Sequence, residues 1–486
     1  MAYKHGVYNT EQATSLTVPI QGSAGLQVIF GTAPIHLAKD PAAAVNTPKL
    51  VYSYKEAVEA VGYSDDFDTF TLCQSISACF QVFNVAPIIL VNVLDPNKAA
   101  HVTQNQAESC DVVDGVVLYD KKYVLLNTLA VKNGSATLVA GSDYEAAHED
   151  DGSVAITLLS AAAKEDSSLT VSSTSLKPSG VTAADIVGGV DASTGKETGL
   201  ELIRQIYPTL GMVPGLILAP GWSHTPTVAA ALQAKTENIN GNLNCSCLLD
   251  ISADSDGAVV YTSVKGAKEA LGASSPHAAA LWPMVAVGEK KYYFSAMFAA
   301  LTAYTDANNA DVPYESPSNK DLRITATVLK DGTTVALDQQ QADDVLNANG
   351  VITAVNADGF KSWGNNTAAY PSTTDPKDRW WAVRRFFDWD GNNFIRTYFQ
   401  KVDKPGNKRL IQSIVDSQNI IGNGYVARDY CAGYRVEFRS DENPVTNLLA
   451  GHLTTHTYMA PYIPAEYIEN VREYDVDALE SAIGGE

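Results

Sequence analysis

The chain has 486 residues, of which 45% are hydrophobic and 18% charged. These proportions are typical of a folded protein and exclude an intrinsically disordered chain. The formal net charge of −21 disfavours binding to DNA or to anionic membrane surfaces.

Cysteines and targeting signals point to one compartment. The six cysteines are few for this length and lie mostly in apolar runs, so we expect buried free thiols in a reducing compartment. The first residues lack the apolar core of a secretion signal, and no run approaches the roughly 18 apolar residues that cross a bilayer. We therefore expect a cytoplasmic product without membrane association, divided into roughly three domains.

The first part of the chain alternates between strand and helix patterns. Residues 1–20 are polar, rich in Thr and not periodic, which predicts an extended arm. A buried strand at 26–35, helices at 52–62 and 69–84, and an apolar strand at 86–96 follow. This order predicts an α/β unit with a parallel sheet.

The pattern changes near residue 109. Residues 109–195 consist of short alternating runs separated by Gly, Asp, Ser and Asn, which predicts a small β-sandwich without long helices. Strand and helix patterns then alternate again up to residue 305. The sandwich is therefore predicted to be inserted into a doubly wound α/β domain formed by 21–108 and 196–305.

A third region, 306–465, begins with a loop rich in Pro and Asn and is predicted to form an α+β domain. Asp375 is a suitable helix N-cap with Pro376 at the first helical position. A second helix at 406–421 is expected to end at the Gly-Asn-Gly of 422–424, before two strands.

The stretch "RWWAVRRFFDWDGNNFIRTYFQ" at 379–400 concentrates eight aromatic and four arginine side chains. Helical spacing places five apolar residues on one stripe, which we expect to anchor the helix in its own domain. The anchoring residues are Trp380, Val383, Phe387, Ile395 and Tyr398.

The arginines of this stretch fall away from the predicted stripe. Residues 377–409 hold nine Lys or Arg against four Asp, a local charge of +5 in an acidic chain. This favours docking to an acidic partner surface over stacking of single-stranded nucleic acid. Alternatively, an arginine here pairs with Asp388 or Asp390 inside its own domain.

No catalytic, cofactor or metal site is predicted. "GWSHT" at 221–225 nearly matches the G-x-S-x-G elbow, but Thr225 replaces the second Gly and no histidine can be assigned as the base. Ser223 is more simply explained as a capping residue before a helix. A hydrolase-like enzyme with an accessory β domain, using Ser223, is the alternative function.

Several segments resemble the tail sheath proteins of contractile-tailed bacteriophages. They are "AYKHGVY", "LQVIFGTAPI", "GYSDDF", "WAVRRFFDWDGNNFIRTYFQKVDKPGNKRLIQSIVDSQN", "DENPVTNLLAGHL" and "YIPAEYIENVREYDVDAL". The likeness covers most of the chain, is weakest in 109–195, and is closest to sheaths of phages and defective prophages of Gram-positive bacteria.

The resemblance implies a structural protein with a subtilisin-like α/β fold, an inserted β-sandwich and a C-terminal domain that faces the tail tube. It also implies terminal arms, here 1–20 and 466–486, that add strands to neighbouring subunits in stacked hexameric rings. The arm residues expected to contact neighbours are Tyr3, Val7, Tyr8, Tyr467, Ile468, Val471 and Tyr474. The rings would form a helical sheath whose contraction drives the tube through a cell envelope.

By the same resemblance, five basic residues would face carboxylates of the tube. They are Arg384, Arg385, Arg396, Lys401 and Lys404. Reversing the charges of Arg384 and Arg385 is expected to impair assembly without disturbing the fold.

The expected partners are other copies of the chain, the tube protein, and baseplate and tail terminator proteins, with no nucleic acid, membrane or cofactor. The protein would assemble in the bacterial cytoplasm and end in a virion tail or a phage-tail-like particle. A shell or surface-layer protein is disfavoured because an export signal is missing.

Overall fold

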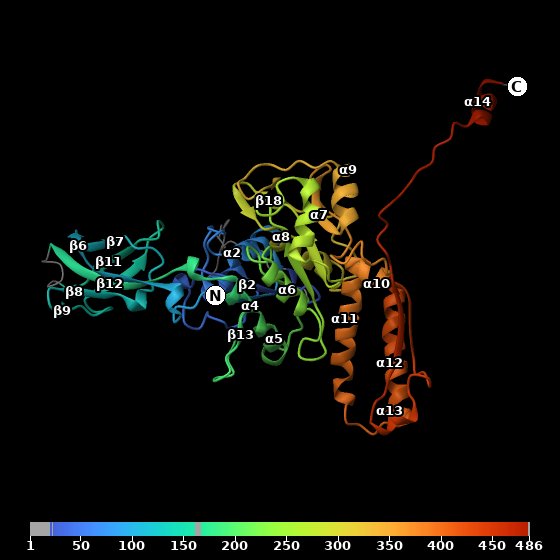
Figure 1. Cartoon of the computed structure of the whole chain (residues 1–486), viewed down its shortest axis with the longest axis horizontal. Helices are drawn as coiled ribbons and strands as arrows, with labels where there is room; N and C mark the ends of the chain where they lie inside the picture. Colours follow the sequence, from blue (N-terminus) through green and yellow to red (C-terminus); the bar gives the residue numbers. More distant parts are fainter. Residues whose placement is uncertain (1–19, 22, 161–166, 485–486) are drawn as a thin grey trace, which may run out of the picture.

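The computed structural model describes residues 20–21, 23–160 and 167–484. At its centre lies an eight-stranded sheet with the order β22-β21-β17-β16-β15-β2-β5-β3 (Figure 1). Its strands are β2 (Gln27–Gly31), β3 (Lys49–Val51), β5 (Ile88–Asn92), β15 (Leu216–Leu218), β16 (Ser246–Asp250), β17 (Ala278–Leu281), β21 (Val351–Asn356) and β22 (Phe360–Trp363). The six strands from β21 to β5 are parallel, and the edge strands β3 and β22 are antiparallel to their neighbours. The predicted mixed α/β class is confirmed.

The central sheet is wound in two directions. The chain forms β2 and β5 toward one edge, returns to place β15 beside β2, and continues through β16, β17 and β21 toward the other edge. Every residue of β2, β5 and β16 is buried, because helices cover both faces of the sheet. The sequence of apolar strands thus predicted the layers, while likeness to subtilisin in particular stays a prediction.

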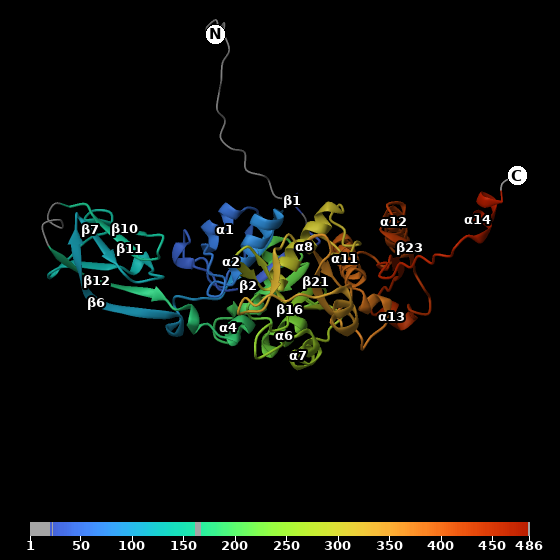
Figure 2. The same cartoon turned by 90° about the horizontal axis from the view of Figure 1, so that it is seen from above.

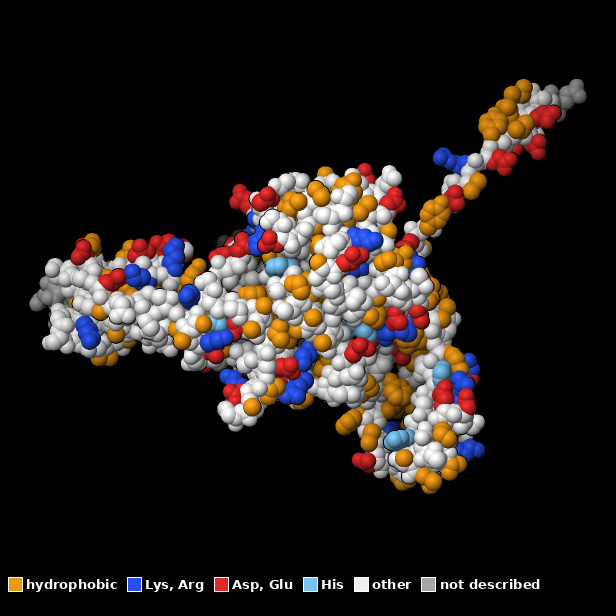
Figure 3. Space-filling model, in the orientation of Figure 1, with side chains coloured by type: hydrophobic (Ala, Val, Ile, Leu, Met, Phe, Trp, Pro, Cys, Tyr) orange, Lys and Arg blue, Asp and Glu red, His pale blue; other side chains and the backbone are white. Residues whose placement is uncertain are grey.

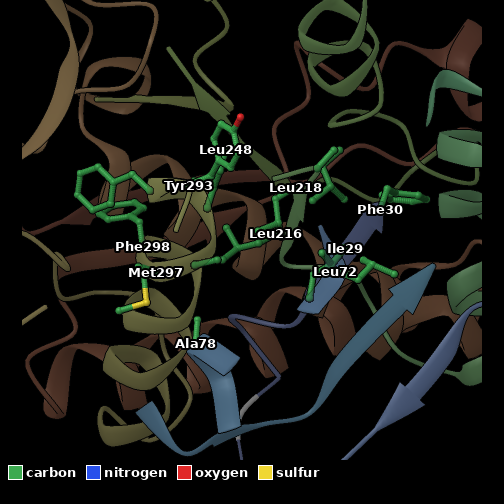
Figure 4. Packing of buried hydrophobic residues seen from close by; sticks show 14 of the residues in the cluster. Ile29, Phe30, Leu72, Ala78, Leu216, Leu218, Leu248, Tyr293, Met297 and Phe298 are labelled. Atoms are coloured by element: carbon green, nitrogen blue, oxygen red, sulfur yellow. The ribbon is translucent and has the colours of Figure 1, made fainter. Parts of the chain in front are cut away.

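Two helical layers flank the sheet (Figure 2). One contains α1 (Tyr54–Val61), α2 (Leu72–Ile76) with the π-helical turn that follows it (Ser77–Phe83), and α8 (Phe294–Asn308); the other contains α4 (Ala183–Val187), α6 (Pro226–Ala234) and α7 (Val264–Leu271). Close to the second layer, α5 spans Ile203–Leu210. Figure 4 shows how the strands and helices share one core, with Ile29 and Leu216 of the sheet near Leu72 and Met297 of the helices.

The inserted domain is an antiparallel sheet with the order β10-β11-β7-β6-β12-β8-β9. Its strands are β6 (Val102–Val113), β7 (Val116–Tyr119), β8 (Ala130–Asn133), β9 (Ala136–Thr137), β10 (Tyr144–His148), β11 (Val154–Leu158) and β12 (Ser168–Leu176). Side chains from both halves of the sheet, among them Tyr119, Val131, Ile156 and Val171, are fully buried in a separate core. Since no described helix lies within this domain apart from one short turn, the sheet must fold over itself, as expected of a sandwich.

The limits of the insertion differ from the predicted 109–195. The domain begins with β6 at Val102 and ends with β12 at Leu176. The residues after β12 return to the main body, where Ile186 of α4 is buried in the central core. Two two-residue strands, β13 (Gly189–Val190) and β14 (Glu197–Thr198), complete this return. The Ser- and Gly-rich composition of this stretch made it look like part of the sandwich.

The predicted boundary at residue 306 is also wrong. The strands β21 and β22 belong to the central sheet, and a small sheet of β18 (Met284–Val287), β19 (Lys290–Tyr292) and β20 (Ala326–Val328) spans the boundary. The loop that resembled a linker is tied to the body, since Asp311 accepts hydrogen bonds from the backbone of Ser23 and Ala24. A short helix, α9 (Gln339–Gln341), also lies in this region.

A C-terminal unit follows at one end of the body. It contains α10 (Pro376–Arg379), α11 (Trp381–Tyr398), α12 (Lys408–Ala427), β23 (Cys431–Glu437), α13 (Val445–Leu449), β24 (His456–Pro461) and α14 (Val476–Ile483). In Figure 1 the helices α11 and α12 run side by side away from the body, and α13 lies at their far end. Phe386, Tyr425 and Tyr434 form part of a core that this unit shares with Val312 of the preceding loop.

Two helix limits differ from the sequence prediction. The cap at Asp375 is confirmed, because its side chain accepts a hydrogen bond from the backbone of Lys377, but the helix is interrupted at Trp380, which is extended. The second helix does not stop at the Gly-Asn-Gly motif and continues to Ala427. In addition, β1 (Ile20–Gln21) pairs with β4 (Val85–Ala86) beside the main layer. None of the helices in the described residues is both long and apolar enough to span a bilayer.

Candidate interaction surfaces

Helix α11 contacts the body through polar side chains. Asn392 donates to the backbone carbonyl of Asn244 at 2.6 Å and accepts from the backbone nitrogen of Asn244 at 3.0 Å. One turn earlier, Asp388 lies 3.0 Å from Nδ1 of His277. Because these contacts recur every three to four residues, one face of α11 is fixed to the body along most of the helix.

Arg385 is not a tube-facing residue in this structure. Its side chain is only 3% exposed, and both guanidinium nitrogens donate to the carboxylate of Asp306, which is itself buried. Burial raises the pKa of Asp306, and the adjacent guanidinium of Arg385 opposes that shift. The prediction of an exposed contact at this position is wrong, because the arginine neutralises a carboxylate of the last turn of α8.

Arg384 is also engaged within its own chain. It donates to Asp378 at 3.2 Å and to Asp388 at 2.9 Å. This is the alternative that the sequence left open, an arginine paired inside its own domain. A charge reversal at Arg384 and Arg385 would therefore disturb the fold, contrary to the sequence-based expectation.

The anchoring stripe was predicted in part. Trp380, Val383 and Tyr398 are buried, whereas Phe387 and Ile395 are only half-buried. The most completely buried aromatic residues of the stretch are Trp381 and Phe386, which the prediction missed. Because Trp380 is extended and lies outside α11, the predicted stripe is out of phase with the buried face of the helix.

The far end of the α11–α12 hairpin is basic and apolar. Arg396 and Lys404 are exposed and Lys401 is half-buried. The neighbouring side chains of Phe399 and Val402 are 72% and 63% exposed. This surface, which we call the hairpin tip, carries the part of the predicted basic set that remains accessible; its contact with a tube stays a prediction.

A second surface is the two-stranded sheet of β23 and β24. Its register runs from Cys431 opposite Pro461 to Glu437 opposite His456. Helix α12 lies along β23, where the Asn419 amide donates to the backbone carbonyl of Val436 and accepts from its backbone nitrogen. Within the described residues each strand pairs only with the other, and the outer edge of β24 remains open, whereas Asn419 occupies the outer edge of β23 at Val436. Open edges are sites where a further strand can be added.

The C-terminal arm leaves this sheet as an exposed, extended segment. Residues 462–475 form no helix or strand, and Tyr467, Ile468, Val471 and Tyr474 are all at least 69% exposed. Figures 1 and 2 show the arm projecting from the molecule. The predicted counterparts in the N-terminal arm, Tyr3, Val7 and Tyr8, lie outside the described residues.

Among the described residues, Glu466 links the arm to the body through side-chain hydrogen bonds. Glu466 accepts hydrogen bonds from Asn365 at 3.1 Å and from Arg379 at 3.4 Å. Arg379 is itself held by Asn366 and lies over the rings of Tyr370 and Trp380. Beside this contact, a groove of about 840 Å³ separates the base of the arm from the body. The contact therefore fixes the point from which the arm extends.

Ser223 is not placed to act as a nucleophile. The residue is fully buried, its hydroxyl donates to Asp250 at 2.7 Å, and Ser295 donates to the same carboxylate. Burial raises the pKa of Asp250 and lowers that of His224, whose ring stacks on Tyr293 instead of contacting the serine. The serine thus serves a closed polar network at the ends of β15 and β16, and it does not cap α6, which begins after Thr225.

Among the described residues, no group of three or more His, Cys, Asp or Glu side chains is arranged to hold a metal ion. Cys245 and Cys247 are buried in the core as free thiols, and burial raises the pKa of both. His456 lies 2.6 Å from a carboxylate oxygen of Glu442. The exposed interaction surfaces are the features on which a function can be argued.

Comparison with known proteins finds relatives among phage tail sheath proteins. No family model matches the chain. The tail sheath protein of Burkholderia phage BcepMu is 28% identical over an alignment of 508 positions, which covers 99% of this chain and 99% of that protein. The chain is similar in sequence to the tail sheath proteins of several phages. A putative prophage major tail sheath protein of Pseudomonas aeruginosa is 25% identical over 58% of this chain and 70% of its own length.

The fold of this chain also occurs in a solved assembly. A subunit in the contracted PVC sheath complex of an extracellular contractile injection system has a TM-score of 0.57 and 14% identity, covering 98% of this chain and 99% of that chain. The shared fold therefore includes the body, the insertion and the C-terminal unit. The resemblance to tail sheath proteins is confirmed, and its restriction to phages of Gram-positive bacteria stays a prediction.

Proposed function

We propose that the chain is the subunit of a contractile tail sheath, a structural protein without enzymatic activity. The observation that carries the proposal is the similarity to a tail sheath protein over 99% of both chains. The exposed arm and the open-edged sheet of β23 and β24 support it, because a polymer needs a donor and an acceptor on each copy.

Neighbouring copies are joined by strand exchange. Residues Tyr467 to Tyr474 of one copy pair with the open edge of β24 in another, and the N-terminal arm with Tyr3, Val7 and Tyr8 adds a further strand to a neighbouring copy. A two-stranded sheet is only marginally stable alone, so added strands stabilise the acceptor as well as the link. Main-chain hydrogen bonds tolerate rotation of one copy relative to the next, which suits hexameric rings that stack into a helical sheath.

The hairpin tip faces the tail tube. Arg396, Lys401 and Lys404 remain accessible there, and the chain elsewhere is strongly acidic. Exposed ion pairs contribute only about 0–1 kcal/mol each, which allows a sheath to release its tube when it contracts. Arg384 and Arg385 position the helix that carries this tip and do not themselves contact the tube.

Contraction is a change between two lattices of the same subunits. The extended sheath is metastable, and rotation of the copies leads to a shorter and wider lattice with more lateral contact. The further partners are the tube, baseplate and tail terminator proteins. Assembly takes place in the bacterial cytoplasm and ends in a virion tail or a phage-tail-like particle.

Negative-stain electron microscopy of the concentrated protein, alone and with a tube protein, tests the proposal. Hollow tubes of constant diameter with a six-fold helical repeat are expected. Discrete globular particles under both conditions would contradict a sheath. A variant with Arg396, Lys401 and Lys404 changed to Glu should still polymerise alone but should no longer assemble around the tube. The matched control changes Lys39, Lys49 and Lys55 to Glu, on the opposite side of the body, and should still assemble around the tube.

A further inference from the structure

The end of the C-terminal arm is an amphipathic helix that nothing in the described part of the chain covers. Asp475 caps α14 by accepting a hydrogen bond from the backbone of Ala478. Val476, Leu479 and Ile483 lie on one face of the helix and are 63%, 42% and 75% exposed. An isolated helix of this length is marginal in water, so an apolar face of this kind needs a surface to pack against.

A second uncovered apolar surface lies on α13. Val445, Leu448 and Leu449 are exposed, and no charged residue occurs between 443 and 451. The loop that precedes α12 packs against the loop that follows α13, where Gly406 approaches Leu453. This contact places the exposed Lys408 and Arg409 close to α13, and Figure 3 shows basic groups near an apolar surface at that end of the molecule.

The two surfaces are complementary in charge as well as in polarity. The segment that forms α14 and its cap carries Asp475, Asp477 and Glu480 and no basic residue. We propose that α14 of one copy docks its apolar stripe onto α13 of a second copy, with its acidic side chains toward Lys408 and Arg409. The inference rests on the proposed sheath function and specifies a contact between its subunits.

A second copy is a better occupant than the same chain. The arm is held at Glu466 beside Arg379, at the start of the α11–α12 hairpin, whereas α13 lies at the far end. The 18 residues of α11 span about 27 Å, and the nine residues from 467 to 475 reach roughly 30 Å when fully extended. The arm can hardly span that length and also turn back onto its own chain.

The positions of donor and acceptor also determine the geometry of association. Each copy carries α14 at one end of its C-terminal unit and the α13 surface at the other. A contact between two different surfaces is heterologous, so each copy binds one neighbour as donor and another as acceptor. Such contacts extend into an open polymer unless the rotation closes a ring.

Substitution in α14 tests the contact under the conditions in which the unmodified chain polymerises. Leu479→Asp should raise the concentration required for polymerisation at least tenfold in a pelleting assay. Ser481→Asp adds the same charge on the opposite face and should leave it unchanged. If Leu479→Asp polymerises normally, the inference is overturned and the sheath proposal still stands. If the unmodified chain does not polymerise, with or without the tube protein, the sheath proposal itself is contradicted.

Charge exchange and cross-linking identify the acceptor. Asp477→Lys with Glu480→Lys, and Lys408→Glu with Arg409→Glu, should each impair polymerisation, and the chain carrying all four changes should recover it. In a Cys110→Ser background, a mixture of Leu479→Cys and Leu449→Cys chains should form disulfide-linked dimers that neither variant forms alone. The inference would be overturned if the chain carrying all four changes did not recover polymerisation and no mixed dimers formed. It would also be overturned if dilute chains carrying both cysteines formed the disulfide within a single chain.

Discussion

Among single residues, the arginines of α11 show how one helix combines two roles. Arg385 faces the body and neutralises Asp306, whereas Arg396 extends into solvent eleven residues later. The difference follows from the position of each side chain around the helix and from how far the body extends alongside it. A buried ion pair contributes little net stability compared with an apolar pair, but loss of one partner leaves an uncompensated charge.

Replacement of Arg385 should therefore be far more destabilising than replacement of Arg384. Arg385→Ala leaves the buried carboxyl of Asp306 without its partner, and we expect a loss of about 3–5 kcal/mol in the free energy of unfolding. Arg384→Ala leaves Asp388 still in contact with His277, and we expect a loss of about 1 kcal/mol. Urea unfolding measures both. Arg385→Met combined with Asp306→Leu should recover part of the loss, and equal effects of the two single changes would contradict the assignment.

Asp390 makes the stability of the C-terminal unit dependent on pH. Burial raises the pKa of its carboxyl group to about 6, although Tyr434 donates a hydrogen bond to it at 2.9 Å. Because the folded pKa lies above the unfolded value, the protonated form is favoured by folding, and this stability is present below about pH 4 and lost as the pH rises through 6.

Asp390→Asn should stabilise the protein at neutral pH. The amide still accepts the hydrogen bond from Tyr434 and carries no charge, so the expected gain is up to about 3 kcal/mol at pH 7 and close to zero at pH 4. Thermal unfolding of the variant and the parent at both pH values measures the difference. Asp416→Asn on the exposed side of α12 is the control, and a gain that does not decline toward pH 4 would refute the explanation.

Among the elements, α12 shows what the sequence predicts and where it fails. The start of the helix was predicted from its periodicity, and its end was misplaced because two glycines usually interrupt a helix. Gly422 is required there for a long-range reason, since a Cβ atom would lie 2.0 Å from the ring of Tyr434. The same limitation explains Arg385, whose partner Asp306 is 79 residues away. Strands and helices were thus predictable from local patterns, but the faces they bury were not.

The two glycines of this motif should respond in opposite ways to alanine. Gly422→Ala forces the Tyr434 ring or the helix to move and should cost about 1–3 kcal/mol, as overpacking does. Gly424→Ala meets only the end of the Arg428 side chain, at 3.4 Å, and should gain about 0.5–1 kcal/mol from helix propensity. Thermal unfolding of the two variants decides the matter, and a stabilised Gly422→Ala would show that the ring contact is not restrictive.

In the whole molecule, buried apolar side chains form three separate cores, one for each part of the chain. The central core holds the body together, the insertion has its own core, and the C-terminal unit bears the hairpin tip, the open sheet and the arm. The layered class and the existence of an insertion could be predicted from changes in periodicity. The domain limits could not, because they depend on which residues pack together after folding, as Ile186 and β21 show.

The insertion is joined to the body through two neighbouring strands. The backbone nitrogen of Lys177 donates to the carbonyl of His101 at 2.7 Å, so the two ends of the insertion are adjacent. Replacing residues 102–176 by a two-residue turn should leave a folded body. The loss of Leu125 and Leu176 from the central core should lower its melting temperature by several degrees.

The same deletion distinguishes the interfaces proposed for assembly. In Figure 1 the insertion lies at the opposite end of the molecule from the C-terminal unit, which carries the strand-exchange sheet, the arm and the hairpin tip. The shortened chain should therefore still polymerise, forming tubes of reduced outer diameter under the electron microscope. If a folded, shortened chain forms no polymer while the full chain does, copies must instead be joined through the insertion, because every other proposed contact is still present.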